Sequence, residues 1–185
     1  MGTTKLESLT AAIAAAAGNA FRELFDTAAA GEHFYYCTLV TTEEGFAPVV
    51  SAWSREALAR EAQENTDDPT FAEEVKWSYA DSPYCEFGYE TYFDEVERLF
   101  DERPSADELS DKKWDDELEL RLAAMTEAMA RLDREGLFAR NQPRREVVVC
   151  AELMPPDASN AKRVRKLNPP SEAVEDYLRE AAESE

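Results

Sequence analysis

A cysteine, a histidine and a carboxylate are the residue types in this chain that could together form a nucleophilic site. His33 is the one histidine among 185 residues, and there are three cysteines. A cysteine enzyme would use Cys85 as the nucleophile, His33 as the base and Asp81 as the carboxylate that orients the base. Asp81 lies close to Cys85 in sequence, but no spacing places His33 beside them. The competing interpretation makes Cys85 a small apolar side chain packed among aromatic residues.

Metal and nucleotide chemistry have little support in the sequence. A single histidine excludes histidine-rich metal centres and the HExxH pattern, and the three cysteines contain no CxxC pair that could ligate zinc. The glycine-rich loops that bind nucleotide phosphates and the GxSxG turn of α/β hydrolases are also missing. Close pairs of carboxylates carry little information, because 40 acidic residues create many pairs by chance. We therefore expect no metal and no cofactor, and the sequence leans toward a protein that is not an enzyme.

The segment from Lys76 to Gly88, KWSYADSPYCEFG, is the most unusual part of the sequence. It gathers one Trp, two Tyr and one Phe around small polar residues. As structure, it predicts a core-forming crossing in which Asp81 and Ser82 bond to nearby backbone and Pro83 fixes a turn. As function, it predicts a cleft or interface lined by aromatic side chains. The binding residues would then be Trp77, Tyr79, Asp81 and Tyr84.

The charge is distributed unevenly along the chain. The 40 acidic and 20 basic residues give a net charge of −20, which would repel nucleic acids and anionic membranes. Fourteen acidic and four basic residues lie between Glu86 and Glu119, whereas seven basic and three acidic residues lie between Arg140 and Pro170. The acidic stretch predicts a surface that attracts a basic protein partner. Its contact residues would be Tyr92, Trp114, Asp115 and Asp116.

A solvated surface is the competing interpretation of this acidity. Exposed carboxylates keep a protein soluble, and a salt-adapted cytoplasm favours them as well. On this interpretation the chain is a housekeeping domain with no specific partner. The sequence contains no signal for an oligomeric state.

Cysteine usage and hydropathy predict the compartment. Cys37, Cys85 and Cys150 are too few and too scattered for a disulfide framework, which favours a reducing environment. No apolar run reaches the roughly 18 residues of a membrane-spanning helix. The alanine-rich stretch 11–17 lacks the positively charged start of a signal peptide. We expect a soluble cytoplasmic protein.

The hydrophobic pattern predicts the elements that position these residues. Apolar steps of three and four predict a long helix ending at Gly31 and another over residues 111–135, and shorter helices are expected over 55–64, up to about 103, and after Ser171. Aromatic and β-branched runs predict strands over 34–42, 48–53 and 146–153, with a short extended segment over 75–79. The fold class is α+β: a small, mainly antiparallel sheet of three to four strands covered by several helices. Residues 1–185 form one domain, with 155–185 as a C-terminal helical extension.

Three sequence blocks resemble an uncharacterised bacterial family of unknown function. They are YYCTLVTT from Tyr35, PVVSAWS from Pro48 and KWSYADSPY from Lys76. The members of that family are single small domains of similar length, so the resemblance covers most of the chain. It implies no activity and no site residues, because none is established for the family. The family is similar in size to immunity proteins that neutralise bacterial toxins, and this analogy adds an inhibitor of a basic toxin or effector to the candidate functions.

Overall fold

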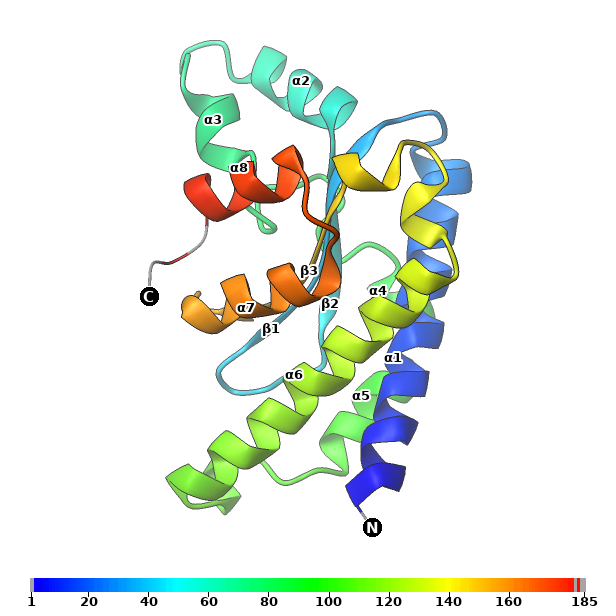
Figure 1. Cartoon of the computed structure of the whole chain (residues 1–185), viewed down its shortest axis with the longest axis vertical. Helices are drawn as coiled ribbons and strands as arrows, with labels where there is room; N and C mark the ends of the chain where they lie inside the picture. The colour runs from blue at the N-terminus through cyan, green and yellow to red at the C-terminus, as the bar shows by residue number, and fades with distance from the viewer. Residues whose placement is uncertain (1, 182, 184–185) are drawn as a thin grey trace.

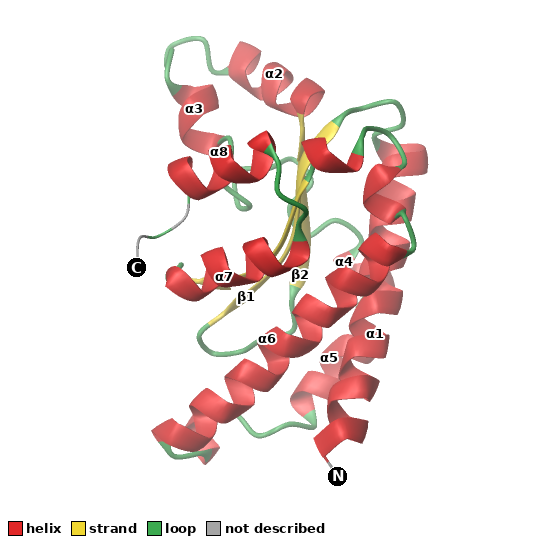
Figure 2. Ribbon diagram, viewed as in Figure 1, coloured by secondary structure: helices red, strands yellow, loops and turns green. Residues whose placement is uncertain are grey.

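A three-stranded sheet forms the centre of the computed structural model, which describes residues 2–181 and 183 (Figures 1 and 2). β1 (Phe34–Thr42) lies between β2 (Val49–Ser54) and β3 (Val148–Met154). β2 runs antiparallel to β1, whereas β3 runs parallel to it. The α+β fold class is confirmed. The sheet is mixed rather than mainly antiparallel, because β3 enters after a long helical crossover and runs in the direction of β1.

One irregularity in β1 decides which side chains face which layer. Alternate residues of a strand normally point to the same face, so Phe34 and Tyr36 would be expected on one side. The register of β1 with β2 shifts between these two residues. As a result, Phe34 packs into one core layer while both Tyr35 and Tyr36 pack into the other. Two tyrosines therefore share the face of the sheet on which the segment from Lys76 to Gly88 lies. We call this segment the aromatic segment.

Two long helices cover the first face of the sheet. α1 (Gly2–Glu23) and α6 (Asp111–Arg134) run beside each other, with α5 (Asp94–Asp101) against α1 (Figure 1). The apolar stripe of α1 is buried, as the periodicity predicts. A Cβ atom on Gly18 would lie 2.9 Å from Leu132 Cδ2, so this glycine lets α1 approach α6 closely.

Four shorter helices cover or flank the second face. α7 (Ala158–Leu167) and α8 (Glu172–Glu180) pack against β3, so the C-terminal region contributes to the cover of the sheet. α2 (Arg55–Glu64) and α3 (Phe71–Val75) extend beyond the end of β2 (Figure 1). Ser54 caps α2 by accepting a hydrogen bond from the amide of Ala57 at 2.9 Å, which confirms the predicted start of this helix.

Two predicted elements differ in the structure. The extended segment over Val75–Tyr79 is wrong, because α3 ends at Val75 and a turn follows. Phe71 and Val75 are four residues apart and pack on the same layer, which is the spacing of a helix rather than a strand. The first helix also ends before Gly31. Its α-helical part runs to Glu23, and a π-helical turn over Leu24–Ala28 follows directly.

The remaining turns connect these layers. α4 (Tyr89–Tyr92) leads directly into α5, in agreement with the helix predicted to end near residue 103. Short 3₁₀ turns occupy Ala106–Glu108, Leu137–Ala139 and Arg144–Glu146. In the part of the chain that the structure describes, no helix combines the length and the apolar character needed to cross a membrane.

Candidate functional site

Trp77 lies at the centre of an aromatic cluster on the second face of the sheet. Its ring meets those of Tyr35, Tyr36 and Tyr177 edge-on, with centroid distances of 5.4, 5.9 and 5.3 Å. The indole Nε1 donates a hydrogen bond to Glu180 Oε2 at 2.9 Å. Trp77 is only half-buried, so the cluster joins β1 to α8 and also presents an aromatic surface to solvent.

Side chains of β2 hold the aromatic segment in place. Trp53 Nε1 donates to the carbonyl of Ser78 at 2.7 Å, and Ser51 Oγ donates to the carbonyl of Tyr79 at 2.8 Å. Ser82 Oγ returns a hydrogen bond to the backbone of β2. β2 is an edge strand, and the segment after α3 therefore covers its side chains while satisfying its own backbone groups.

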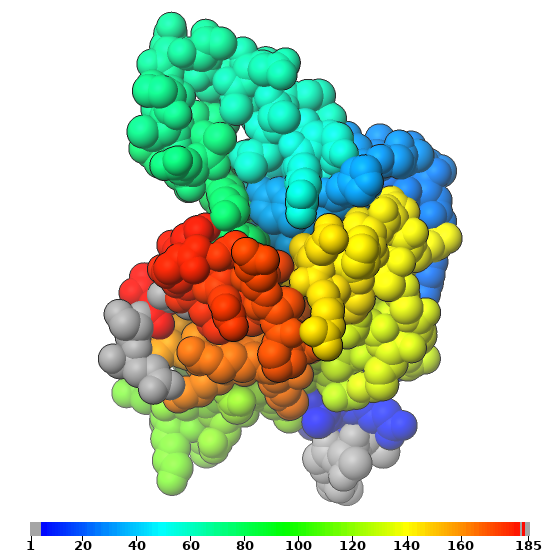
Figure 3. All heavy atoms as spheres, turned by 45° about the horizontal axis from the view of Figure 1, so that its top comes forward, coloured from blue at the N-terminus to red at the C-terminus, as the bar shows by residue number. Residues whose placement is uncertain are grey.

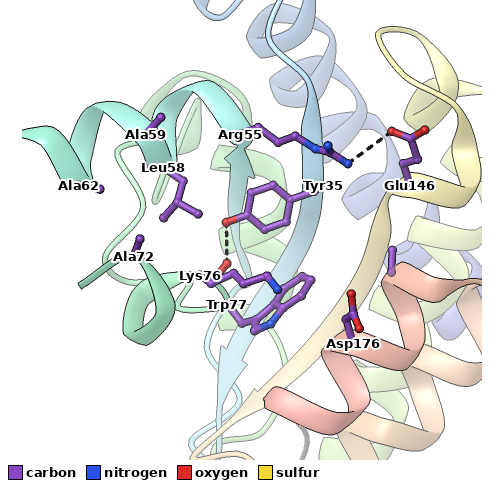
Figure 4. A pocket seen from close by; sticks show the side chains of 11 residues that line it. Tyr35, Arg55, Leu58, Ala59, Ala62, Ala72, Lys76, Trp77, Glu146 and Asp176 are labelled. Atoms are coloured by element: carbon purple, nitrogen blue, oxygen red, sulfur yellow. Dashed lines mark hydrogen bonds and ion pairs between the residues drawn. The ribbon is translucent and has the colours of Figure 1, made fainter. Parts of the chain in front are cut away.

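A cleft of about 420 Å³ opens beside the aromatic cluster, between α2–α3 and α8 (Figures 3 and 4). Tyr35 and Trp77 form its base. The apolar walls come from all three helices, and four of these residues are alanines: Leu58, Ala59, Ala62, Ala72 and Ala173. Short side chains on facing helices leave this space unfilled. The space-filling view shows the same hollow between the α2–α3 region and α8 (Figure 3).

Charged side chains of both signs line the cleft. Arg55 Nη2 on α2 lies 3.5 Å from Glu146 Oε2 along one edge. Lys76 Nζ lies 2.8 Å from Glu180 Oε2 and 4.9 Å from the centroid of the Trp77 ring. The hydrogen bonds from Lys76 and Trp77 lower the pKa of Glu180 to about 2, so this carboxylate is charged at neutral pH.

Asp176 on α8 is the second acidic group of the cleft. Its Oδ1 accepts a hydrogen bond from Arg179 at 2.5 Å, and Arg179 does not line the cleft. Deeper in the wall, the Tyr35 hydroxyl donates to the carbonyl of Lys76 at 2.7 Å. Burial raises the pKa of Tyr35, so this hydroxyl stays protonated and acts as a donor.

A buried carboxylate lies behind the aromatic cluster. Glu152 on β3 is 6% exposed and accepts hydrogen bonds from the hydroxyls of Tyr36, Thr38 (2.7 Å) and Tyr177 (2.5 Å). Burial is the main cause that raises the pKa of Tyr36 and of Tyr177, which keeps both hydroxyls protonated. A cavity of about 190 Å³ lies between this group and Trp77.

The Glu152 network is a satisfied polar element of the core. The hydroxyls of Tyr36 and Thr38 donate to Oε2 and that of Tyr177 donates to Oε1, so both carboxylate oxygens have a partner inside the core. Sequence reasoning missed this site. Its signal was a glutamate placed inside the apolar run VVVCAELM, where a buried acid must find partners.

The nucleophilic site of Cys85, His33 and Asp81 is not assembled. His33 Nδ1 lies 2.6 Å from Glu56 Oε1, and Asp81 accepts a hydrogen bond from Ser78 Oγ at 2.5 Å. Burial, followed by the nearby carboxylates, raises the pKa of the Cys85 thiol, which is the opposite of what a nucleophilic cysteine needs. Within residues 2–181 and 183, no hydrogen bond links these three side chains.

Metal ligation by protein side chains finds no candidate among the described residues. No group of three or more His, Cys, Asp or Glu side chains converges there in a way that could hold an ion. Glu146 in the lining of the cleft pairs with Arg55, and Glu180 beside the cleft bonds to Lys76 and Trp77.

The other predicted binding tyrosines divide between separate places. Tyr79 packs on the aromatic cluster and lines the small cavity beside Glu152. The Tyr84 hydroxyl donates to Glu32 Oε2 at 2.8 Å. The Tyr92 hydroxyl donates to Glu23 Oε2 at 2.7 Å. Of the predicted binding residues Trp77, Tyr79, Tyr84 and Tyr92, the structure therefore brings together Trp77 and Tyr79.

The acidic stretch forms a second candidate site, which we call the acidic surface: residues 86–119. It includes α5 and the first third of α6, at the end of the molecule away from α2 and α3 (Figure 1). Thirteen of its fourteen carboxylates, Asp115 and Asp116 among them, are exposed; Glu117 is the partly buried one. Ion pairs with basic residues engage Glu95, Glu102 and Glu117.

Basic residues near the C-terminus do not neutralise the acidic surface. Arg163 is buried and donates to the carbonyl of Ala151 at 2.7 Å, and Arg144 pairs with Asp133. Arg140 pairs with Asp26 at 2.9 Å. In the described part of the chain, no ion pair joins residues 140–170 to residues 86–119.

Trp114 holds the β1–β2 turn rather than lying free on the acidic surface. Its Nε1 donates to the carbonyl of Glu43 at 3.1 Å, and its ring fits against Gly45. A Cβ atom on Gly45 would lie 2.8 Å from the Trp114 ring, and the residue has a φ of +69°. Arg121 stacks 5.3 Å from the same ring and donates to the Gly45 carbonyl at 2.5 Å.

Phe46, the next residue in this turn, is 66% exposed. No other large apolar side chain in the described part of the chain is exposed. Its carbonyl accepts a hydrogen bond from Thr41 Oγ1 at 2.6 Å, which fixes the backbone beneath it. Sequence reasoning missed Phe46, although a phenylalanine in the polar turn EEGFAP was a visible signal.

The chain belongs to a family described as a domain of unknown function, DUF4303, whose model matches residues 13–169. The match spans the three blocks that resemble an uncharacterised family and confirms that resemblance. No curated protein and no solved structure matches the chain.

Proposed function

We propose that this protein is a non-enzymatic binding domain that takes a basic protein partner on Phe46 and the neighbouring acidic surface. Phe46 is the observation that carries the proposal, because it is a large apolar side chain held in solvent beside the acidic surface, where most carboxylates are exposed. Protein interfaces typically combine a buried aromatic anchor with a polar rim, and charges in the rim guide the encounter.

The backbone around Phe46 supports this role. Trp114 and Arg121 bond to the turn from α6, and Thr41 bonds to it from β1. A turn fixed from two sides loses little conformational entropy when a partner binds. Trp114, which the sequence predicts as a contact residue, acts on this proposal as a support for Phe46.

The carboxylates contribute mainly to the rate and the salt dependence of binding. Of the fourteen carboxylates, three are in ion pairs and eleven are outside any ion pair among the described residues. Such a surface attracts a basic partner over a distance of about one Debye length. An inhibitor of a basic toxin or effector fits this chemistry, since carboxylates would occupy the positions of substrate phosphates. The more specific part of this proposal is an immunity-like role, in which the protein inhibits such a toxin or effector.

Binding assays with matched variants test the proposal. Wild-type protein, Phe46→Ser and the double variant Asp115→Asn/Asp116→Asn would be used to capture partners from cells of the source organism at low and high salt. We expect a basic protein that wild type retains at low salt, that high salt releases, and that both variants retain less. Glu73→Gln/Glu74→Gln on α3 is the control, because it removes the same charge at the opposite end of the molecule.

Two results would contradict the proposal. A captured protein that binds Phe46→Ser as strongly as wild type would place the interface elsewhere. A protein whose retention falls equally in the α3 control would show that net charge alone attracts it, which is what a housekeeping domain with a solubilising surface predicts.

We also infer a cytoplasmic location. Cys37 and Cys150 are buried on neighbouring strands with their thiols free, and Cys85 is half-buried and free. Free thiols of this kind are typical of a reducing compartment. Fractionation of cells with an antibody against the protein tests this, and recovery in the periplasmic or secreted fraction would contradict it.

A further inference from the structure

We propose that the cleft between α2–α3 and α8 binds a zwitterionic small molecule with an apolar side chain, of the kind that apolar amino acids represent. The cleft is separate from Phe46 and the acidic surface, so this inference does not depend on the proposed function. It rests on the shape of the apolar base, on the positions of two charged groups, and on the balance of charge in the lining.

The apolar part of the cleft fits a ring or a branched aliphatic chain. Its volume of about 420 Å³ lies in the range of small-molecule sites, and its base is formed by two aromatic residues, Tyr35 and Trp77. Ala59 and Ala62 on α2 and Ala173 on α8 contribute to its lining. A ligand side chain placed there would be removed from water on several sides, which is the main source of affinity for apolar groups.

Arg55 is the basic group with spare capacity for a ligand. Its guanidinium carries five N–H donors, yet the one ion pair that it forms among the described residues, with Glu146, is long at 3.5 Å. Lys76, the other basic residue of the lining, is already engaged by Glu180 at 2.8 Å and by the Trp77 ring. A ligand carboxylate would therefore bond to Arg55, whose planar fork suits a carboxylate.

Asp176 is the matching acidic group on the opposite helix. Figure 4 shows it projecting from α8, across the cleft from Leu58 and Ala72, while Arg55 extends from α2 along the upper edge. Its Oδ1 is bonded to Arg179, and no hydrogen bond to Oδ2 occurs among the described residues. A ligand ammonium group would bond to Asp176.

The balance of charge selects a ligand with both groups. Arg55 and Lys76 contribute two positive charges to the lining, and Glu146 and Asp176 contribute two negative ones. A ligand with a single net charge would leave one side chain of the cleft without a partner while it desolvates that side chain, which costs free energy. A zwitterion matches one group on each wall.

Three ligands that differ by one group test the charge requirement. L-Phenylalanine carries both charges, phenethylamine lacks the carboxylate, and 3-phenylpropionate lacks the ammonium group. Binding would be measured by isothermal titration calorimetry and by intrinsic tryptophan fluorescence, to which Trp77 contributes together with Trp53 and Trp114. We expect L-phenylalanine to bind at least about fivefold more tightly than either analogue, since each loses one charge-assisted hydrogen bond. Equal affinities for the three ligands, or no binding of L-phenylalanine at about 10 mM, would overturn the proposal.

Variants of the cleft locate the binding. Arg55→Gln should weaken L-phenylalanine binding and leave phenethylamine binding unchanged, and Asp176→Asn should weaken L-phenylalanine and leave 3-phenylpropionate unchanged. Ala59→Leu adds a larger side chain to the wall and should weaken all three ligands. The affinity of the dipeptide L-alanyl-L-phenylalanine, compared with that of L-phenylalanine, shows whether a short peptide or a free amino acid is the better ligand.

Matched controls separate binding from folding. Arg140→Gln removes an arginine of a similarly exposed ion pair, and Ala15→Leu enlarges an exposed alanine on α1. Both controls should bind L-phenylalanine as wild type does, and thermal unfolding should show all five variants folded. Unchanged L-phenylalanine affinity in Ala59→Leu, or an equal loss in the controls, would overturn the assignment to this cleft.

Discussion

Tyr177 on α8 donates a hydrogen bond of 2.5 Å to Glu152 on β3, and this bond joins the last helix to the interior of the sheet. The carboxylate is buried, so its three hydroxyl donors replace the water that it would otherwise bind. The same helix forms one wall of the cleft through Ala173 and Asp176. A buried polar contact therefore sets the position of a cleft wall.

Tyr177→Phe should destabilise the protein. The change removes one donor from a buried carboxylate and keeps the aromatic packing, so the expected loss is about 1.5–3 kcal/mol in the free energy of unfolding. Chemical denaturation measures it. Tyr92→Phe is the control, since it removes a similar hydroxyl–carboxylate bond in an exposed setting and should therefore cost much less. Equal losses in the two variants would show that burial of Glu152 has no energetic effect.

Gly45→Ala should cost more than Gly31→Ala. Both glycines have a positive φ, so alanine is strained by about 1 kcal/mol at either position. At Gly45 the new Cβ would also meet the Trp114 ring at 2.8 Å, whereas Gly31 has open space around it. The difference between the two unfolding free energies measures this clash. A loss at Gly45 no larger than the loss at Gly31 would mean that the Trp114 ring moves aside without cost.

Glu117 should make stability depend on pH at acidic values. Burial acts to raise the pKa of Glu117, but hydrogen bonds from Arg103 and Arg121 outweigh it and lower the pKa below 4.5. A group whose pKa is lower in the folded state stabilises the fold above its unfolded pKa and loses this effect as the pH falls through the folded value. Wild type should therefore have a higher free energy of unfolding than Glu117→Gln at pH 7.

The comparison of these two proteins at lower pH completes the test. Their unfolding free energies should converge as the pH is taken down from 4.5 through the lowered pKa of Glu117. A difference that stays constant over this range would assign the effect of the substitution to packing and not to the charge.

Cys85 should react slowly with thiol reagents, and His33 should not affect its rate. Burial raises the pKa of the Cys85 thiol, so little thiolate is present at neutral pH, and His33 is paired with Glu56. Reaction with a chromogenic disulfide reagent measures the rate in wild type and in His33→Ala. Cys37 and Cys150, both fully buried, should react only after unfolding. A large drop in rate in His33→Ala would revive a cysteine–histidine site.

The sequence predicts the long helices and the strands well, because their signals are local. The apolar stripe around Ile13 and Phe21 and the β-branched run of β3 report burial directly. The parallel direction of β3 could not be predicted, since it depends on where α6 delivers the chain. The packing of Tyr35 and Tyr36 on the same face of the sheet could not be predicted either, because it results from an irregularity in the register of β1 with β2.

The candidate sites could be predicted in part, because some of their residues also have local signals in the sequence. The aromatic content of the segment after α3 indicated Trp77 and Tyr79, but not the cleft, whose space depends on alanines from α2, α3 and α8 meeting in the fold. Residue type alone suggests His33 as the base for Cys85, whereas the contact of His33 with Glu56 depends on tertiary position. Residue chemistry gave the candidates, and only the fold selects between them.

The parallel pairing of β1 with β3 also bears on how the chain folds during synthesis. Tyr36 pairs with Val148, so more than a hundred residues must leave the ribosome before this half of the sheet can close. Until then the hairpin of β1 and β2 has one long, apolar flank with no hydrogen-bonded neighbour, which is the kind of surface that chaperones bind and that aggregates. Late completion of the sheet makes the newly made chain most vulnerable just before its last helices emerge.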